Sequence, residues 1–279
     1  MSAINELREE LARTETAQFV TTMLRDISAT RLQSIRAAYE ANERYFLELH
    51  GLMHLIHTYS AKKGIPLPPA EKGKVYVALT SNRRFYGTLN VDVMQALYEA
   101  KQKDPEASCV VIGQTGKQII ARTPKFAGMK PSYHAFAKDE PTPEEIVQMV
   151  EKLKQHAEVF VVHPTYVNAF EQKGKTTDLT HVPHTKAEEA KTFEYLIEPD
   201  IPRMLDFFKT QIRLVLFDRV VLETRLALTG ARLMKMQRAR ERAEEMLISE
   251  RRLIHKEVRT MQSMRLLETF TGYNNENTL

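Results

Sequence analysis

The stretch KVYVALTSNRRFYGTLNVDVMQAL, Lys74 to Leu97, decides how the middle of this chain is expected to fold. It begins with an apolar strand, passes through a polar turn with two arginines, and ends in a helical pattern. That order is the outline of a phosphate-binding loop. The turn holds Gly87 alone, whereas a dinucleotide fingerprint needs three glycines and a Walker loop needs two followed by Lys-Ser or Lys-Thr. The stretch therefore predicts a strand, a turn and a helix without a nucleotide site.

Further short, nearly continuous apolar runs follow, of the kind that is buried on both faces of a parallel sheet. With the first run they are VYVALT, SCVVIG, VFVVHP and FEYLIEP, which begin at residues 75, 108, 159 and 193. Helical patterns alternate with these runs. We therefore expect residues 74–200 to form a small Rossmann-like α/β domain.

The helical patterns between the runs cover residues 91–103 and 142–155. The second pattern opens on a capping-box signature, with Thr142 as the cap, Pro143 in the first turn and Glu145 three residues after the cap. Stretches rich in turn residues predict surface loops at 122–141 and 171–191.

A second phosphate-loop lookalike is GQTGKQ, Gly113 to Gln118. It is two residues too short between its glycines, and Gln118 stands where a magnesium-binding hydroxyl belongs. A strand-to-helix turn is the preferred interpretation, and nucleotide binding at this place is the alternative.

The two ends of the chain predict long helices. Residues 1–63 and 203–271 contain no proline and one glycine each, with apolar residues at spacings of three and four. A seven-residue row in the second helix is interrupted by Arg240, which indicates a loose coiled coil. The expected fold is an antiparallel coiled coil of an N-terminal helix (1–63) and a C-terminal helix (201–279), joined to the α/β domain at 74–200.

Composition and charge narrow the classes of function. The apolar runs fall far short of the roughly 20 residues of a bilayer helix, and the lone Cys109 suits a reducing compartment. The net charge is +4, and residues 201–279 carry +5, with Arg as 12 of their 15 cations. This excess suggests an acidic protein surface or a nucleic acid as partner. Because glutamates alternate with the arginines, the protein surface is the preferred partner.

Histidines offer the only candidate metal ligands. His50, His54 and His57 share one helical face, and His181 and His184 lie in an expected loop. Neither group has a Cys or carboxylate at a suitable spacing, so we expect a polar helix edge, with a metal site as the weaker alternative. No pattern indicates a catalytic site or a cofactor.

Several motifs are similar to those of one known family. TSNRRFYGTLN at 80–90 is similar to its TSDRGLCGGLN, and VTTMLRDISATRL at 20–32 is similar to its ITKAMKMVAASKL. Residues 222–243 follow the spacing of its LES…ARM…M…A…A pattern, and RLLETFTG at 265–272 compares with its ELTEIVGG. With the order of long helix, α/β domain and longer helix, the whole chain resembles the gamma subunit of rotary F-type ATP synthases.

The resemblance implies roles for individual residues. The domain motif, which lies in the foot of the rotor, keeps Thr80, Ser81, Arg83, Gly87 and Asn90. The residues implied to face the catalytic ring are Arg25, Arg31, Arg232, Met236, Arg238, Arg240, Arg242 and Arg259. The chain departs from the family at Asp26, where the family has Met, and at His255 and Val258-Arg259, where it has Asn and Arg-Gln. These departures are typical of a divergent member with its own ring contacts.

The function implied by the resemblance is mechanical. A central rotor stalk couples ion flow to ATP synthesis or hydrolysis at a surrounding ring, with no catalytic site, cofactor or small-molecule substrate of its own. The implied partners are catalytic and non-catalytic ring subunits, a small epsilon-like stalk subunit and the membrane rotor ring, without nucleic acid. The implied location is peripheral, at the cytoplasmic face of a bacterial cell membrane. The alternatives are a non-rotary coiled-coil adaptor with an α/β head and an enzyme that uses the α/β layer.

Overall fold

The computed structural model describes residues 2–63, 73–83, 86–126, 128–168, 170–180 and 201–276. The chain divides into two compact units. Unit 1 runs to Ser28 and resumes at Leu233, and unit 2 is Ala29–Arg232. Two long helices, α1 (Ser2–Lys63) and α5 (Ile201–Glu276), contribute residues to both units.

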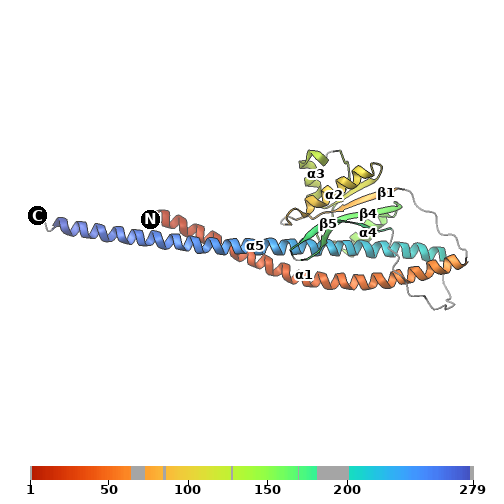
Figure 1. The fold of residues 1–279 in the computed structure, drawn as a ribbon, viewed down its shortest axis with the longest axis horizontal. Coiled ribbons are helices and arrows are strands. Elements are labelled where there is room, and N and C mark those ends of the chain that lie inside the picture. Colours follow the sequence, from red (N-terminus) through yellow and green to blue (C-terminus); the bar gives the residue numbers. More distant parts are fainter. Residues whose placement is uncertain are drawn as a thin grey trace. The chain divides into compact units, whose positions relative to one another are not determined.

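Unit 2 is built on a five-stranded sheet with the strand order β3-β2-β1-β4-β5. Figure 1 labels three of these strands, β1, β4 and β5. The strands are β1 (Lys74–Leu79), β2 (Ser108–Ile112), β3 (Ser132–His134), β4 (Glu158–Tyr166) and β5 (Gln172–Asp178). The first four are parallel to one another, and β5 pairs with β4 in the antiparallel sense. This is the α/β layer that the sequence predicts, with one antiparallel edge.

Alternation along β1 sends its side chains into two cores. Val75 and Val77 are fully buried and pack with α1, α5 and α4 (Pro143–Leu153). Tyr76 and Ala78 point to the opposite face, where α2 (Leu89–Lys103) and α3 (Gln114–Arg122) cover the sheet. The sheet is therefore the middle layer between two layers of helices, which explains why its strands read as continuous apolar runs.

The capping box predicted for α4 is confirmed. The Glu145 amide donates to Thr142 Oγ1 at 3.3 Å, and the Thr142 amide donates to the Glu145 carboxylate at 2.8 Å. Proline occupies the first turn, where its missing N–H removes no helical hydrogen bond. The turn predicted at Gly113 is also confirmed, because this glycine lies between the last residue of β2, Ile112, and the first residue of α3, Gln114.

The prediction of surface loops at 122–141 and 171–191 is wrong for the residues that form β3 and β5. Both are edge strands of the sheet. Most side chains of β5 are exposed and polar, as is common at edges that must resist pairing with other chains. A strand without an apolar face gives no alternating signal. The predicted strand FEYLIEP, with Glu198 and Pro199, lies outside the described residues.

Within unit 2, α1 and α5 pack against each other as antiparallel partners. Arg219 of α5 donates hydrogen bonds to Tyr39 at 3.1 Å and to Glu43 at 2.9 Å on α1. Between those two α1 residues, Asn42 donates to Asp218 at 2.9 Å, whereas Ile35, nearer the start of α1, packs with Leu222 and Leu226, further along α5. Residue numbers fall along α5 as they rise along α1, so the pair is antiparallel, as the sequence predicts.

Unit 1 consists of the remaining parts of the same two helices, again antiparallel. Thr14 donates to Glu250 at 2.9 Å, and Gln18 donates to Glu244 at 3.3 Å. The seam holds small, polar and apolar residues. Among the described residues of unit 1, the buried ones are Ile4, Thr14, Ser28, Met236, Ala243, Leu247 and Glu250. This mixture confirms a loose coiled coil over a uniform zipper.

No helix among the described residues has the length and apolar character needed to cross a bilayer. The three-part division into 1–63, 74–200 and 201–279 stays a prediction, because the helices that it separates share both units.

Candidate functional site

The first candidate site is the motif loop, residues 80–90, which follows β1. Thr80 lies at its start, and its hydroxyl donates to the Ile112 carbonyl oxygen at 2.6 Å. The same hydroxyl accepts a hydrogen bond from the Gly116 amide at 3.1 Å. Thr80 thus ties the end of β1 both to β2 and to the first turn of α3.

Ser81 and Asn90 join the two ends of the motif loop. The Asn90 side chain accepts from the Ser81 amide at 3.0 Å and donates to the Ser81 hydroxyl at 2.9 Å. The Ser81 hydroxyl donates in turn to the Arg83 carbonyl oxygen at 2.8 Å. Gly87 has a φ of +63°, a left-handed conformation that favours glycine in the turn before α2. Four of the five motif residues therefore hold the shape of the loop.

The start of α3 shows why the GQTGKQ lookalike is not a phosphate cradle. Its backbone amides, which would bind a phosphate in a P-loop, already have partners in the motif loop. The Gln114 amide donates to Asn82 Oδ1 at 3.0 Å, and the Thr115 amide donates to the Ser81 carbonyl oxygen at 3.0 Å. A Cβ on Gly113 would lie 2.3 Å from the Thr80 carbonyl oxygen, so glycine is required by close packing. The glycines of this segment serve the fold.

A second polar cluster connects the motif loop to α5. The Asn82 amide donates to one oxygen of Asp139, and the Tyr86 hydroxyl donates to the other at 3.1 Å. Arg232 of α5 donates to the Tyr86 hydroxyl, and its guanidinium lies 4.7 Å from the centre of the Tyr86 ring. Burial, assisted by the Asp139 carboxylate, raises the pKa of Tyr86 to about 12. Tyr86 therefore stays protonated and donates at neutral pH.

Beside this cluster lies a cavity of about 430 Å³, which we call the basic cavity. Its polar lining consists of Arg31, Ser34, Arg83, Tyr86, Lys138, Asp139, Glu140, Arg225, Thr229 and Arg232, with Ile35 and Leu228 as apolar walls. The structure thus brings together Arg31 and Arg232, predicted at the catalytic ring, with Arg83, predicted in the foot motif. All of them belong to unit 2.

Sequence reasoning missed Tyr86, Lys138, Asp139 and Arg225 as members of this cavity. A signal existed for Arg225, because it lies seven residues before Arg232 and so shares its helix face. Lys138 and Asp139 come from a connecting segment after β3, where no hydrophobic periodicity predicts which way a side chain points.

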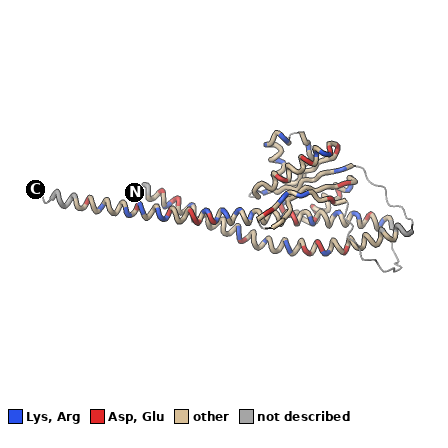
Figure 2. Tube along the Cα trace, viewed as in Figure 1, with Lys and Arg blue, Asp and Glu red and all other residues tan. Residues whose placement is uncertain are grey.

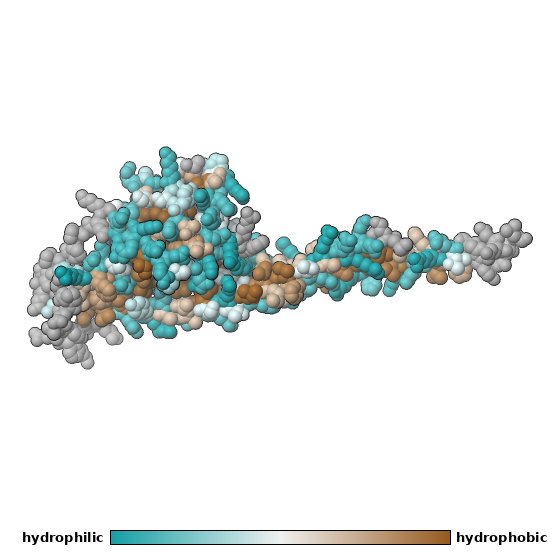
Figure 3. Space-filling view, turned by 180° about the vertical axis from the view of Figure 1, so that it is seen from behind, coloured by the Kyte–Doolittle hydropathy of each residue, from teal (hydrophilic) through white to brown (hydrophobic). Residues whose placement is uncertain are grey.

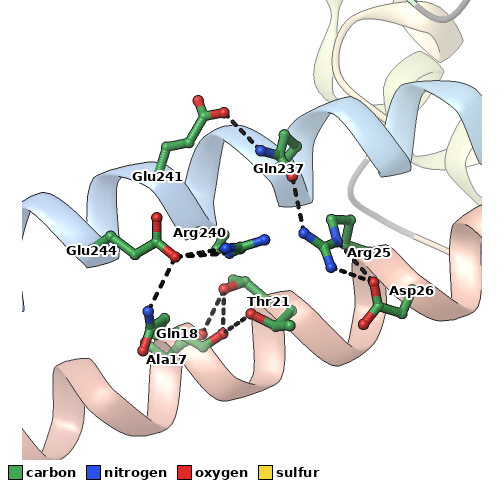
Figure 4. Close-up of polar contacts among 10 residues, drawn as sticks. Ala17, Gln18, Thr21, Arg25, Asp26, Gln237, Arg240, Glu241 and Glu244 are labelled. Atoms are coloured by element: carbon green, nitrogen blue, oxygen red, sulfur yellow. Dashed lines mark hydrogen bonds and ion pairs between the residues drawn. The ribbon is translucent and has the colours of Figure 1, made fainter.

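The second candidate site is the helix pair of unit 1. Arg25 of α1 contacts the neighbouring Asp26 at 2.6 Å and donates to Gln237 of α5 at 3.5 Å (Figure 4). Asp26, one of the departures from the family pattern, thus has its charge balanced by a cation one residue away. Arg240 is bound to Glu244 at 2.8 Å, and the same carboxylate accepts from Gln18 across the pair (Figure 4).

The other predicted ring residues differ in exposure. Met236 is buried in the seam, with 6% of its surface accessible. Arg238, Arg242 and Arg259 are exposed on α5, and none of them forms an ion pair with a carboxylate among the described residues. Along both helices of unit 1, basic and acidic residues alternate (Figure 2).

Unit 1 also exposes large apolar side chains, and brown patches interrupt the hydrophilic surface of its helices (Figure 3). On α1 they are Phe19, Val20, Met23 and Ile27, and towards the end of α5 they are Met264, Leu266, Leu267 and Phe270. Phe19 and Phe270 are 66% and 68% exposed. Exposed apolar side chains at this density are typical of a surface that another protein covers.

Within the parts of the chain that the structure describes, His, Cys, Asp and Glu side chains form no group of three that could hold a metal ion. His50 stacks on Phe46 with 5.8 Å between ring centres. His181 and His184 lie outside the described residues, as does the side chain of His57.

Comparisons with known proteins agree with this architecture. The profile of a family described as ATP synthase matches residues 3–260. The ATP synthase gamma chain of Psychrobacter arcticus is 23% identical over 291 residues, which cover 98% of each chain. The gamma chain of Symbiobacterium thermophilum is 28% identical over 179 residues, or 62% of each chain.

Two solved structures share the fold. A chain in the rotor of the Euglena gracilis mitochondrial ATP synthase aligns with a TM-score of 0.63 at 13% identity, covering 93% of this chain and 99% of that one. A chain from the central stalk and c-ring of the Tetrahymena thermophila mitochondrial ATP synthase aligns with a TM-score of 0.60, also at 13% identity. It covers 79% of this chain and 99% of its own.

Proposed function

We propose a detailed rotor role from one premise: the chain belongs to the ATP synthase family, as a gamma chain. It is a non-catalytic subunit, and the catalytic sites of such a complex lie on other subunits. It acts as the central rotor stalk that couples rotation to ATP synthesis or hydrolysis.

The helix pair of unit 1 is the part that we propose to lie inside the catalytic ring. The observation that carries this proposal is the exposed apolar surface of unit 1 between alternating charges. Such a surface is unfavourable in water but suits a shaft that a ring of subunits sheathes. Phe19 and Met23 of α1 and Phe270 of α5 belong to it.

Asymmetry of this pair supplies the coupling. The exposed side chains around the pair are not equivalent: Phe19, Met23 and Ile27 form an apolar row at four-residue spacing on α1, whereas Arg238 and Arg242 share one face of α5 with acidic side chains. Each ring subunit therefore meets a different surface as the shaft turns. A ligand-binding site changes its affinity only through contacts that differ between states. We propose that these differing contacts set the affinity for ADP and ATP at each catalytic site.

The arginines divide into two roles under this proposal. Arg238, Arg242 and Arg259 present guanidinium groups that can bind carboxylates of ring subunits bidentately. Arg25 and Arg240 already bind Asp26 and Glu244, so they act mainly by holding charges in place on the shaft. Met236 acts from within the seam, where its flexible side chain adapts the packing of the two helices.

Unit 2 is proposed as the foot of the rotor, against the membrane rotor ring and a small epsilon-like stalk subunit. The hydrogen bonds of Thr80, Ser81 and Asn90 support this role, because they tie the end of β1 to β2 and to the start of α2. Arg83 is the motif residue whose side chain lines the basic cavity.

The proposed location is the cytoplasmic face of a bacterial cell membrane, with the chain attached through its partners. The match with gamma chains of Psychrobacter arcticus and Symbiobacterium thermophilum supports a bacterial origin.

Co-expression with the ring subunits encoded by the same genome, followed by native mass spectrometry, tests the assignment. A rotor stalk should be present once in each complex with several copies of the ring subunits. A chain that purifies as a homodimer, and that no ATPase subunit accompanies, would instead be the non-rotary adaptor.

A further inference from the structure

The basic cavity lies at the edge of the sheet where α/β proteins bind ligands, beyond the carboxyl ends of the parallel strands. Arg83 and Tyr86 follow β1, and Lys138 belongs to the segment after β3. Arg31 approaches from α1, and Arg232 approaches from α5. Cations from four separate segments of unit 2 therefore converge on one space of about 430 Å³, a volume in the range of small-molecule sites.

The two carboxylates of the cavity already have partners. Asp139 accepts from the Asn82 amide and from Tyr86, and Glu140 forms an ion pair with Arg225. Glu140 balances Arg225, whereas the partners of Asp139 are neutral and leave its charge in place. With five cations and two carboxylates, the lining of the cavity keeps a net charge of +3.

Four cations remain: Arg31, Arg83, Lys138 and Arg232. None of these four side chains makes an ion pair with a carboxylate in the described part of the chain. Like charges that line one cleft repel one another and raise the local concentration of anions. An anion that bridges the four would relieve this repulsion.

We propose that the basic cavity binds a condensed phosphate: pyrophosphate, tripolyphosphate or the phosphate chain of a nucleotide. Such an anion is compact, carries several negative charges and offers oxygens in all directions, which matches donors that approach from different sides. A rotor role does not require this site, and the site does not require rotation. Failure of one proposal therefore leaves the other standing.

This recognition differs from a P-loop. The amides at the start of α3 bind Thr80, Ser81 and Asn82, so side-chain cations supply the contacts with the phosphates. Phosphate charge should then decide affinity, and a nucleoside should add little.

Isothermal titration of the full-length chain with inorganic tripolyphosphate at low ionic strength tests the proposal. We expect saturable binding of one tripolyphosphate per chain. Arg31→Ala and Lys138→Ala should each weaken binding by about tenfold or more, because each variant removes one charge-assisted contact. Both side chains lie at the surface of the cavity, and circular dichroism checks that the variants fold.

Lys103→Ala is the matched control, since it also removes one positive charge from unit 2. Lys103 is exposed in the last turn of α2 and does not line the basic cavity. Equal weakening by Lys103→Ala would overturn the proposal, as would a lack of saturation at millimolar tripolyphosphate. Two further titrations, with ATP and with a hexaglutamate peptide, show which kind of anion the cavity binds. ATP should bind about as tightly as tripolyphosphate. Binding that requires the adenosine, or tighter binding of the hexaglutamate peptide, would also overturn the proposal.

Discussion

At the scale of single residues, the Thr80 hydroxyl shows how a motif that resembles a nucleotide loop can serve structure alone. It donates to the Ile112 carbonyl oxygen and accepts from the Gly116 amide, and Thr80 is buried. Thr80→Val removes both bonds and leaves a buried amide without a partner. We expect unit 2 to lose about 1–3 kcal/mol of unfolding free energy, measured by urea denaturation. Thr80→Ser keeps the hydroxyl and should lose clearly less, and equal losses would contradict this role.

Gly113 has a φ of +103° and lies against the Thr80 backbone. A Cβ at this position would meet backbone atoms that cannot move aside. Gly113→Ala should therefore destabilise unit 2 by about 3 kcal/mol or more in the same denaturation experiment. Gly51, inside α1 with nothing within 4 Å of an added Cβ, is the matched control. Gly51→Ala should stabilise by about 0.8 kcal/mol through helix propensity, and a loss there would show that the contact at Gly113 does not explain the difference.

His163 predicts how stability depends on pH. Its ring is fully buried, with one nitrogen 3.0 Å from the Pro164 carbonyl oxygen and the other 2.9 Å from the Thr177 hydroxyl. Burial lowers the pKa of His163, although the nearby Glu223 carboxylate acts in the opposite direction. Below the ordinary histidine pKa of about 6.5, the unfolded chain binds a proton that the folded chain does not.

The unfolding free energy should therefore fall as pH falls from 7 towards 5, by up to about 1.4 kcal/mol per pH unit from this histidine. His163→Gln should flatten this dependence in urea denaturation at several pH values. Burial also lowers the pKa of His134, so some dependence should remain. An unchanged slope in His163→Gln would contradict the assignment.

At the scale of elements, the sequence predicts the helices and strands that have an apolar pattern or a capping motif. The runs that became β1, β2 and β4, the capping box of α4 and the two terminal helices all have such signals. The edge strands β3 and β5 do not, because pairing with a neighbour stabilises them while their side chains stay mostly exposed. The basic cavity could not be predicted either, since its cations come from segments that only the tertiary fold brings together.

The coiled coil of unit 1 contains a buried hydrogen bond between Thr14 and Glu250, and its contribution to stability can be measured by substitution. Thr14 and Glu250 are 7% and 6% exposed, and one oxygen of Glu250 has no hydrogen-bond partner. Thr14→Val removes the partner of the other oxygen and should destabilise unit 1 by about 1–3 kcal/mol. The double variant Thr14→Val/Glu250→Leu should be as stable as the original chain or more so, because apolar packing replaces a desolvated carboxylate.

Hydrogen exchange of the amides of residues 2–28 compares Thr14→Val, Glu250→Leu and the double variant. Losses that add up in the double variant would show that the two residues act independently. In that case the buried hydrogen bond would not be what holds α1 and α5 together at this position.

At the scale of the whole molecule, the proposed rotor role predicts that substitution of Arg238 and Arg242 affects ATP turnover more than substitution of Arg240. The first two are exposed, whereas Arg240 is bound to Glu244 at 2.8 Å. Arg238→Ala/Arg242→Ala should slow ATP turnover of the assembled complex several-fold, because contacts with ring carboxylates that form in only some shaft positions are lost. Arg240→Ala should have a smaller effect. The reverse order, or no effect of the double variant, would contradict this division.

Rotation itself is the most direct test of the central claim. Cys109 is buried, with only 7% of its surface accessible. Lys103→Cys therefore provides one accessible thiol for a probe on the full chain. With the catalytic ring fixed to a surface, the probe should turn in one direction when ATP is added and stop when ATP is removed. A probe that stays still while the same complexes hydrolyse ATP would contradict the account of this chain as the rotor.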